Sequence, residues 1–147
     1  MVIDAAFDEV SVAEARNRFS ELTRNVTDRN KLVRVKRQKA GHGEVYWLPE
    51  KVWHELLSFV KFNVSIERDP ITNLWDVREE NLGVSGSGET KDEAAEDFLD
   101  TLLIAAQDYF ENADFYLRQP NLAHRLPYYL KIASAGAPDK VRSILGL

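Results

Sequence analysis

The sequence contains no cysteine. Disulfide bonds and thiolate metal sites are therefore excluded, and the composition suits a reducing cytosol. Long apolar runs are also missing, because the longest, LLIAA, is far short of the roughly 20 residues that a membrane-spanning helix needs. The N-terminus, MVIDAAFDEV, has acidic residues where a secretory signal would carry positive charge. These absences predict a cytoplasmic protein with no membrane contact.

Motifs for catalysis or cofactor binding are equally scarce. The three histidines are scattered along the chain, and the stretch GVSGSGET lacks the lysine of a phosphate-binding loop. Asp69, Asp76 and Glu79 lie near predicted strands, where a metal-dependent nuclease would need converging carboxylates. Their spacing matches no ligand motif, and Asp69-Pro70 is better explained as a turn. We therefore predict that the protein is not an enzyme and has no catalytic residues, no metal site and no cofactor.

Charge is distributed very unevenly along the 147 residues, although the net charge is only −5. Residues 29–39 carry six basic side chains and no acidic one. Residues 62–117 carry three basic side chains against fourteen acidic ones, and residues 118–147 carry five against one. A polyanion would favour the first part of the chain, and a basic partner would favour the middle. The hydrophobic fraction of 44% is normal for a globular protein of one medium or two small domains.

Residues 1–61 have the pattern of a β-α-β-β-α unit. Ser11 and Glu14 form a capping box that predicts a helix over 12–27. Its apolar stripe comprises Ala15, Phe19, Leu22 and Val26. Alternation over 32–37 and 44–48 predicts a hairpin around the turn AGHG. A second helix would follow Pro49, and its predicted buried face consists of Val52, Trp53, Leu56, Leu57 and Val60.

Residues 62–112 have the pattern of a β-β-β-α unit. Two strands flank the turn 69–73, and Gly83, Gly86 and Gly88 interrupt the chain around a short third strand. Thr90 and Glu93 form another capping box. The apolar face of the following helix comprises Ala94, Ala95, Phe98, Leu99, Leu102, Ala106, Tyr109 and Phe110.

Residues 113–147 form a tail with two short helical patterns, LPYYLKIA and DKVRSIL. Each is too short to be stable alone, so we expect each to dock on another surface. The tail could pack on its own body or reach into a groove of a partner.

The stretches SVAEARNRFSELTRNV, KLVRVKRQKAG and EVYWLPEKVWHELL resemble, in this order, the N-terminal module of the Phd/YefM antitoxin family. The Glu-Ala-Arg start of the helix and the strand with a basic end carry the resemblance. It implies a dimerisation and DNA-binding module over residues 1–61. It also implies DNA contacts at Arg16 and Arg37.

Residues 62–112 resemble a HicB-type antitoxin domain, chiefly because GETKDEA is similar to the Gly-Asp-Thr-x-x-Glu-Ala helix start of that family. Together the two resemblances imply an antitoxin of a bacterial type II toxin-antitoxin system. Its partner would be a cognate small basic toxin, commonly one that cleaves RNA. The expected fold is α+β, with a Phd/YefM-like head, a HicB-like unit and a helical tail.

The residues themselves support a DNA site at one end of the head. Arg16 and Arg18 flank the apolar stripe of the first helix without belonging to it, and Asn17 offers a donor and an acceptor for a base edge. Lys36 and Arg37 lie at the far end of the basic strand, where cations can bind phosphates. The alternative is that the basic side chains only solvate an exposed strand and helix face.

These observations lead to one functional prediction and one alternative. The chain would bind and neutralise its toxin and, as a homodimer, repress its own operon by binding operator DNA, since paired half-sites double the contacts of one small head. The alternative is a ligand or protein-interaction module of the same fold that does not bind DNA.

Overall fold

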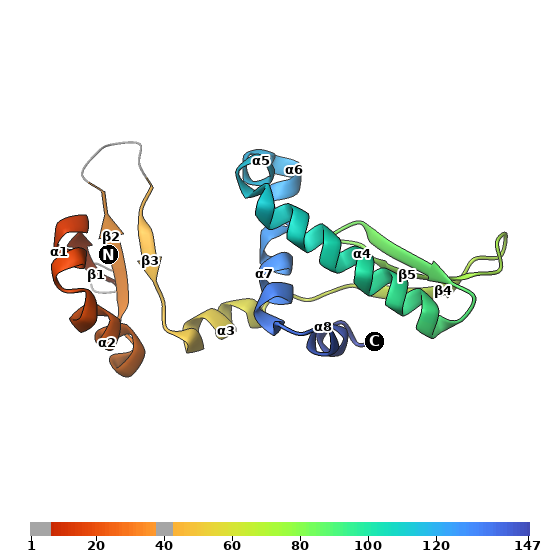
Figure 1. Ribbon diagram of the computed structural model, residues 1–147, viewed down its shortest axis with the longest axis horizontal. Helices are drawn as coiled ribbons and strands as arrows, with labels where there is room; N and C mark the ends of the chain where they lie inside the picture. Colours follow the sequence, from red (N-terminus) through yellow and green to blue (C-terminus); the bar gives the residue numbers. More distant parts are fainter. Residues whose placement is uncertain (1–6, 38–42) are drawn as a thin grey trace, which may run out of the picture. The chain divides into compact units, whose positions relative to one another are not determined.

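The computed structural model describes residues 7–37 and 43–147, and the chain divides into two compact units, residues 1–56 and 57–147. We call these units the head and the body. Each contains one three-stranded sheet (Figure 1). Within the described ranges, no helix has both the length and the apolarity to cross a membrane. The fold is α+β, as expected.

The head has the predicted β-α-β-β-α order, with its first helix divided in two. Its elements are β1 (Phe7–Ser11), α1 (Val12–Asn17), α2 (Phe19–Arg29), β2 (Leu32–Lys36), β3 (Val45–Trp47) and α3 (Glu50–Ser58), the last of which contains the boundary between the units. Strand β2 is central, parallel to β1 and antiparallel to β3. The core of the head comprises Val10, Ala15, Leu22, Val26, Val33 and Val35, with Trp47 partly buried against it.

The capping box at the start of α1 is confirmed. The Ser11 hydroxyl accepts the backbone N–H of Glu14 at 3.1 Å, and the Ser11 backbone N–H donates to the Glu14 carboxylate at 2.9 Å. The prediction of one helix over 12–27 is wrong, because the chain leaves helical geometry at Arg18, with φ −109° and ψ 20°. The break turns Phe19 out of the core: its side chain is 59% exposed, although we expected it in the apolar stripe.

The predicted buried face of the second head helix is also partly wrong. In α3, Leu57 is buried, whereas Leu56 is 53% exposed and Val52 is only partly buried. A helical repeat of apolar residues shows which side chains share a face, but the width of the buried stripe depends on the elements that cover it.

The body contains the expected β-β-β-α arrangement. Its strands are β4 (Val64–Arg68), β5 (Trp75–Glu79) and β6 (Val84–Gly88), all antiparallel with β5 in the centre, and they are followed by α4 (Lys91–Glu111). The capping box of Thr90 and Glu93 starts α4, as predicted. The predicted apolar face of α4 is buried except at its last member, Phe110, which is 37% exposed.

We expected Gly86 and Gly88 to interrupt the chain around the third strand, and this prediction is wrong. Both residues lie within β6, under α4. A Cβ atom on Gly86 would be 2.1 Å from the backbone nitrogen of Phe98, and one on Gly88 would be 2.6 Å from that of Ala94. The missing side chains therefore let the helix pack directly on the strand.

The tail forms four short helices, and its last two complete the core of the body. They are α5 (Ala113–Arg118), α6 (Pro120–Ala123), α7 (Leu126–Ala135) and α8 (Pro138–Leu145). Tyr129 and Ile132 of α7 and Val141 and Leu145 of α8 are buried in the same cluster as Phe98 of α4. The tail thus packs on its own body, which was one of the two arrangements that the sequence left open.

Candidate functional site

The head has an exposed apolar hollow of about 310 Å³, which we call the head hollow. Helix α1, the start of α2 and strands β2 and β3 supply its lining: Val12, Ala15, Arg16, Phe19, Val35, Arg37, Val45 and Trp47. Phe19 and Trp47 meet edge to face with ring centroids 5.4 Å apart. Val12 and Val45 are each 51% exposed. Such a cluster of exposed apolar side chains is typical of an interaction surface.

Arg16 and Arg37 line this same hollow, although they are 21 positions apart in the sequence. Arg16 lies in the last turn of α1, and Arg37 directly follows β2. Both are exposed, and neither forms a salt bridge within the described residues. The fold therefore brings together the two residues that were the leading candidates for DNA contact.

The other three candidates lie differently. Arg18 forms an ion pair of 2.8 Å with Glu21, which raises the pKa of the guanidinium and lowers that of the carboxyl. Lys36 lies 2.5 Å from the Glu9 carboxylate on β1, in a smaller adjoining hollow that Arg37 also lines. Asn17 is exposed at the end of α1.

Most of the basic strip at residues 29–37 is neutralised by acidic residues of the head itself. Lys31 pairs with Asp8 at 3.5 Å, and Arg34 pairs with Glu9 and lies 3.8 Å from Glu44. The sequence alone did not indicate this charge compensation, because the partners are far apart in the chain. They meet because β1 and β2 are parallel neighbours, with Glu9 opposite Arg34. Lys39, the last basic residue of the strip, lies outside the described residues. Of the basic residues at 29–37, Arg37 is the one that lines the head hollow, and it forms no salt bridge within the described residues.

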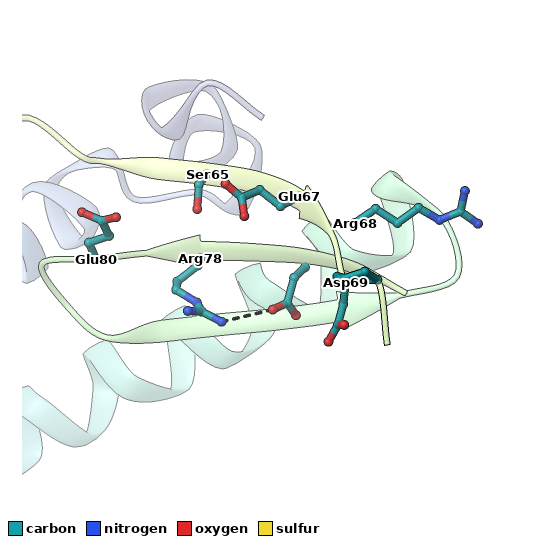
Figure 2. Close-up of a pocket in the computed structure, with 8 residues that line it drawn as sticks. Ser65, Glu67, Arg68, Asp69, Arg78 and Glu80 are labelled. Atoms are coloured by element: carbon teal, nitrogen blue, oxygen red, sulfur yellow. Dashed lines mark hydrogen bonds and ion pairs between the residues drawn. The ribbon is translucent and has the colours of Figure 1, made fainter. Parts of the chain in front are cut away.

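The body has a second, polar hollow of about 350 Å³ on the open side of β4 and β5 (Figure 2), which we call the body hollow. Its lining comprises Ser65, Glu67, Arg68, Asp69, Pro70, Asp76, Arg78 and Glu80. Arg78 and Asp76 form an ion pair of 3.2 Å.

The three carboxylates that could have suggested a nuclease do not converge. Asp69 accepts the backbone N–H groups of Ile71 at 2.7 Å and Thr72 at 3.3 Å, which lowers its pKa. Glu79 is buried, and its carboxylate accepts three N–H donors. No group of three or more potential ligands in the described parts of the chain is placed to hold a metal ion.

Comparison with known proteins places the chain in a family. Residues 7–146 match the PHD_like family, which is described as the antitoxin of a toxin-antitoxin, RelE / RelB, TA system. The chain belongs to this family. Membership in an antitoxin family implies a cognate toxin as the partner. No protein among the curated sequences matches the chain.

A solved structure has the same fold. It is a crystal structure at 24% identity, described as an antitoxin part of a proposed toxin/antitoxin system from Syntrophomonas wolfei subsp. wolfei. The similarity has a TM-score of 0.77 and covers 93% of this antitoxin and 95% of the other chain. The likeness therefore extends over both the head and the body.

Proposed function

We propose that this antitoxin neutralises a small basic toxin of the RNA-cleaving kind and represses its own operon by binding operator DNA as a homodimer. Residues 1–61, which include the whole head, would be the Phd/YefM-like part that dimerises and binds DNA. The HicB-like unit of the body, residues 62–112, would meet the toxin together with the tail 113–147. Membership in an antitoxin family supports the toxin partner, and the head hollow supports the rest.

One observation carries the DNA-binding part of the proposal: Arg16 and Arg37 line one exposed surface, and neither has a salt-bridge partner in the described chain. Phosphate contacts need such cations on a fixed surface, and binding gains free energy when the phosphates release condensed counterions. Cations already paired with carboxylates contribute less, because binding must first break the pair. We therefore rank Arg16 and Arg37 above Arg18 and Lys36, with Asn17 available for a base edge.

The homodimer rests on the apolar part of the same hollow. Val12, Phe19 and Val45 are each more than half exposed beside Trp47. A second head that covered them would remove this surface from water, at about 25 cal/mol for each Å² of apolar area buried. Two heads would also present two sets of arginines, which matches the two half-sites of a typical operator.

A gel shift on the DNA upstream of the antitoxin gene, at several salt concentrations, tests the DNA site. We expect Arg16→Ala and Arg37→Ala each to weaken binding and to reduce the salt dependence, since each removes about one phosphate contact. Lys31→Ala is the matched control, because Lys31 is already paired with Asp8, and it should bind nearly as well as the wild type. Wild-type binding in both arginine variants would refute the site, and no binding by the wild type would refute the repressor function.

The alternative function is an interaction module of the same fold that does not bind DNA. The pairing of Lys31, Arg34 and Lys36 with acidic neighbours favours it, since these cations then serve the stability of the head. Co-purification with the product of a neighbouring reading frame, combined with the gel shift, separates the two functions. A stable toxin complex without any DNA shift would support the alternative.

A further inference from the structure

Strand β4 is an edge of the body sheet, and its outer side has backbone groups that do not pair with β5. The Asn63 carbonyl accepts the Glu80 N–H at 3.3 Å, and the Asp69 N–H donates to the Leu74 carbonyl at 2.8 Å. In an antiparallel pair such bonded residues alternate, so Ser65 and Glu67 also face β5. The backbone groups of Ile66 and Arg68 therefore point away from the sheet, at two exposed residues.

The face of the sheet next to this edge is open. Helix α4 packs on the face where Gly86 and Gly88 lie. Ser65 and Glu67 of β4 lie opposite Arg78 and Asp76 of β5. These four side chains line the body hollow on the opposite face (Figure 2). An edge strand and an uncovered face thus adjoin along β4.

This open face attracts positive charge. The body hollow is lined by four carboxylates and two guanidinium groups, and both guanidinium groups are engaged. Arg78 pairs with Asp76, while Arg68 donates to the Asn73 carbonyl at 3.3 Å and lies 6.0 Å from the Trp75 ring. Glu67 has no ion pair within the described residues and lies on β4 itself.

We propose that an extended, cationic segment of the toxin adds to the sheet as a fourth strand beside β4. Its backbone would pair with Ile66 and Arg68, about 4.8 Å from β4. Every second side chain of such a segment would project over the open face, where arginine or lysine would meet Glu67 and Asp69. Ile71, 91% exposed at the tip of the β4–β5 hairpin, would add an apolar contact. This inference rests on the proposed function, in which a basic toxin is the partner.

The charge argues for such a segment over a second copy of this chain. Two copies paired through β4 would bring together two hollows that each have an excess of carboxylates. Like charges at an interface oppose association, whereas opposite charges accelerate it and set specificity.

Nuclear magnetic resonance on the isotope-labelled full chain tests the proposal directly. The probe is a twelve-residue peptide that alternates arginine with valine, and a peptide that alternates glutamate with valine is the negative control. We expect the arginine peptide to shift the backbone amides of residues 64–69 and 74–78, with an effect that falls as salt rises. Glu67→Gln should weaken its binding roughly fivefold, while Asp100→Asn, which removes an exposed carboxylate from α4, should leave it unchanged.

Three outcomes would overturn the inference. The first is a set of shifts centred on the acidic residues of α4. The second is equal binding by the Glu67→Gln variant. The third is a set of shifts in β4 that follows protein concentration without any peptide, which would assign the edge to a second copy.

The same variants separate this inference from the proposed function. If the neighbouring gene product forms a complex that Glu67→Gln does not weaken, the toxin function stands and the β4 site is wrong. If the peptide binds at β4 but no neighbouring product forms a complex, the β4 site stands and the toxin function is wrong.

Discussion

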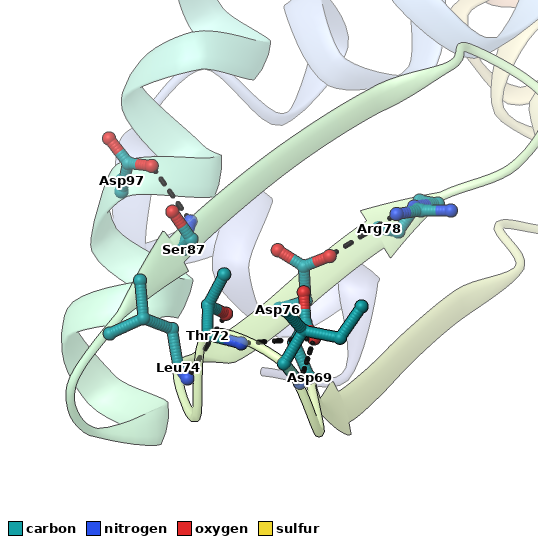
Figure 3. A network of polar contacts seen from close by, with 8 residues as sticks. Asp69, Thr72, Leu74, Asp76, Arg78, Ser87 and Asp97 are labelled. Carbon is teal, nitrogen blue, oxygen red and sulfur yellow. Dashed lines mark hydrogen bonds and ion pairs between the residues drawn. The ribbon is translucent and has the colours of Figure 1, made fainter.

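The Asp97 carboxylate on α4 accepts a hydrogen bond of 2.8 Å from the backbone N–H of Ser87 on β6 (Figure 3). Strand β6 is the other edge of the body sheet, opposite to β4. An edge N–H that already has a charged partner cannot pair with a foreign strand. The two edges of the sheet therefore differ. On β6 the Asp97 side chain accepts the outward N–H of Ser87, whereas the outward N–H groups of β4 face solvent.

Replacement of Asp97 tests this hydrogen bond. We expect Asp97→Ala to lower the free energy of unfolding by about 1 kcal/mol, because a hydrogen bond to a charged group is lost at a partly solvated edge. Asp100→Ala is the control, since it removes a carboxylate from an exposed position three residues further along α4. Urea denaturation gives both values, and equal values would show that the Asp97 bond contributes nothing.

Gly86 should tolerate no side chain. In Gly86→Ala the new Cβ would lie 2.1 Å from the backbone nitrogen of Phe98, so α4 would have to move away from β6. We expect a loss of at least about 3 kcal/mol in the free energy of unfolding. Gly43→Ala makes the same chemical change where no atom lies within 4 Å. Thermal unfolding of the two variants compares them, and similar melting temperatures would contradict the close packing.

The side chain of Glu79 is buried and accepts three hydrogen bonds. Its carboxylate accepts the backbone N–H of Asn63 at 2.9 Å, the Asn81 side-chain amide at 2.9 Å and the backbone N–H of Leu82 at 2.7 Å. In Glu79→Gln an amide donor would replace one acceptor oxygen and confront an N–H group. We expect a loss of about 2 kcal/mol, measured by urea denaturation.

The control for this variant is Glu96→Gln, which makes the same substitution on the exposed face of α4. It should leave the urea midpoint within experimental error of the wild type. A Glu79→Gln variant as stable as this control would show that the three hydrogen bonds do not need two acceptor oxygens.

The hairpin tip should lose stability in acid. Hydrogen bonds from the Ile71 and Thr72 N–H groups lower the pKa of Asp69 in the folded chain. The ionised carboxylate therefore stabilises the fold at pH above the unfolded pKa, and that contribution is lost as the pH falls through the folded pKa. The amide resonances of Ile71 and Thr72 should titrate below the usual aspartate range, and Asp69→Asn should remove the titration while keeping an acceptor oxygen. Titration at the ordinary pKa would contradict these bonds.

The sequence predicted those features that depend on residues close together in the chain. Both capping boxes, at Ser11 with Glu14 and at Thr90 with Glu93, join residues three positions apart, so the pattern alone was sufficient. The order of helices and strands followed from local periodicity for the same reason.

Features that depend on distant partners could not be predicted in this way. Lys36 is paired with Glu9 only because β1 and β2 lie side by side, and no local pattern indicates that neighbour. Phe19 continued a helical stripe in the sequence, but the break at Arg18 turned it into the head hollow. For Gly86, the sequence predicted an interruption of the chain, whereas the residue lies within β6 and is small because α4 packs on it.

Trp75 lies close to two cations, with the Lys91 ammonium 4.5 Å and the Arg68 guanidinium 6.0 Å from the centre of its ring. It is also the single tryptophan of residues 57–147, while Trp47 and Trp53 belong to residues 1–56. Each half of the antitoxin therefore has its own fluorescent reporter. A chain with Trp47→Phe and Trp53→Phe would emit from the body alone, and one with Trp75→Phe would emit from the head alone. The two emission signals could then reveal whether the head and the body unfold together or separately.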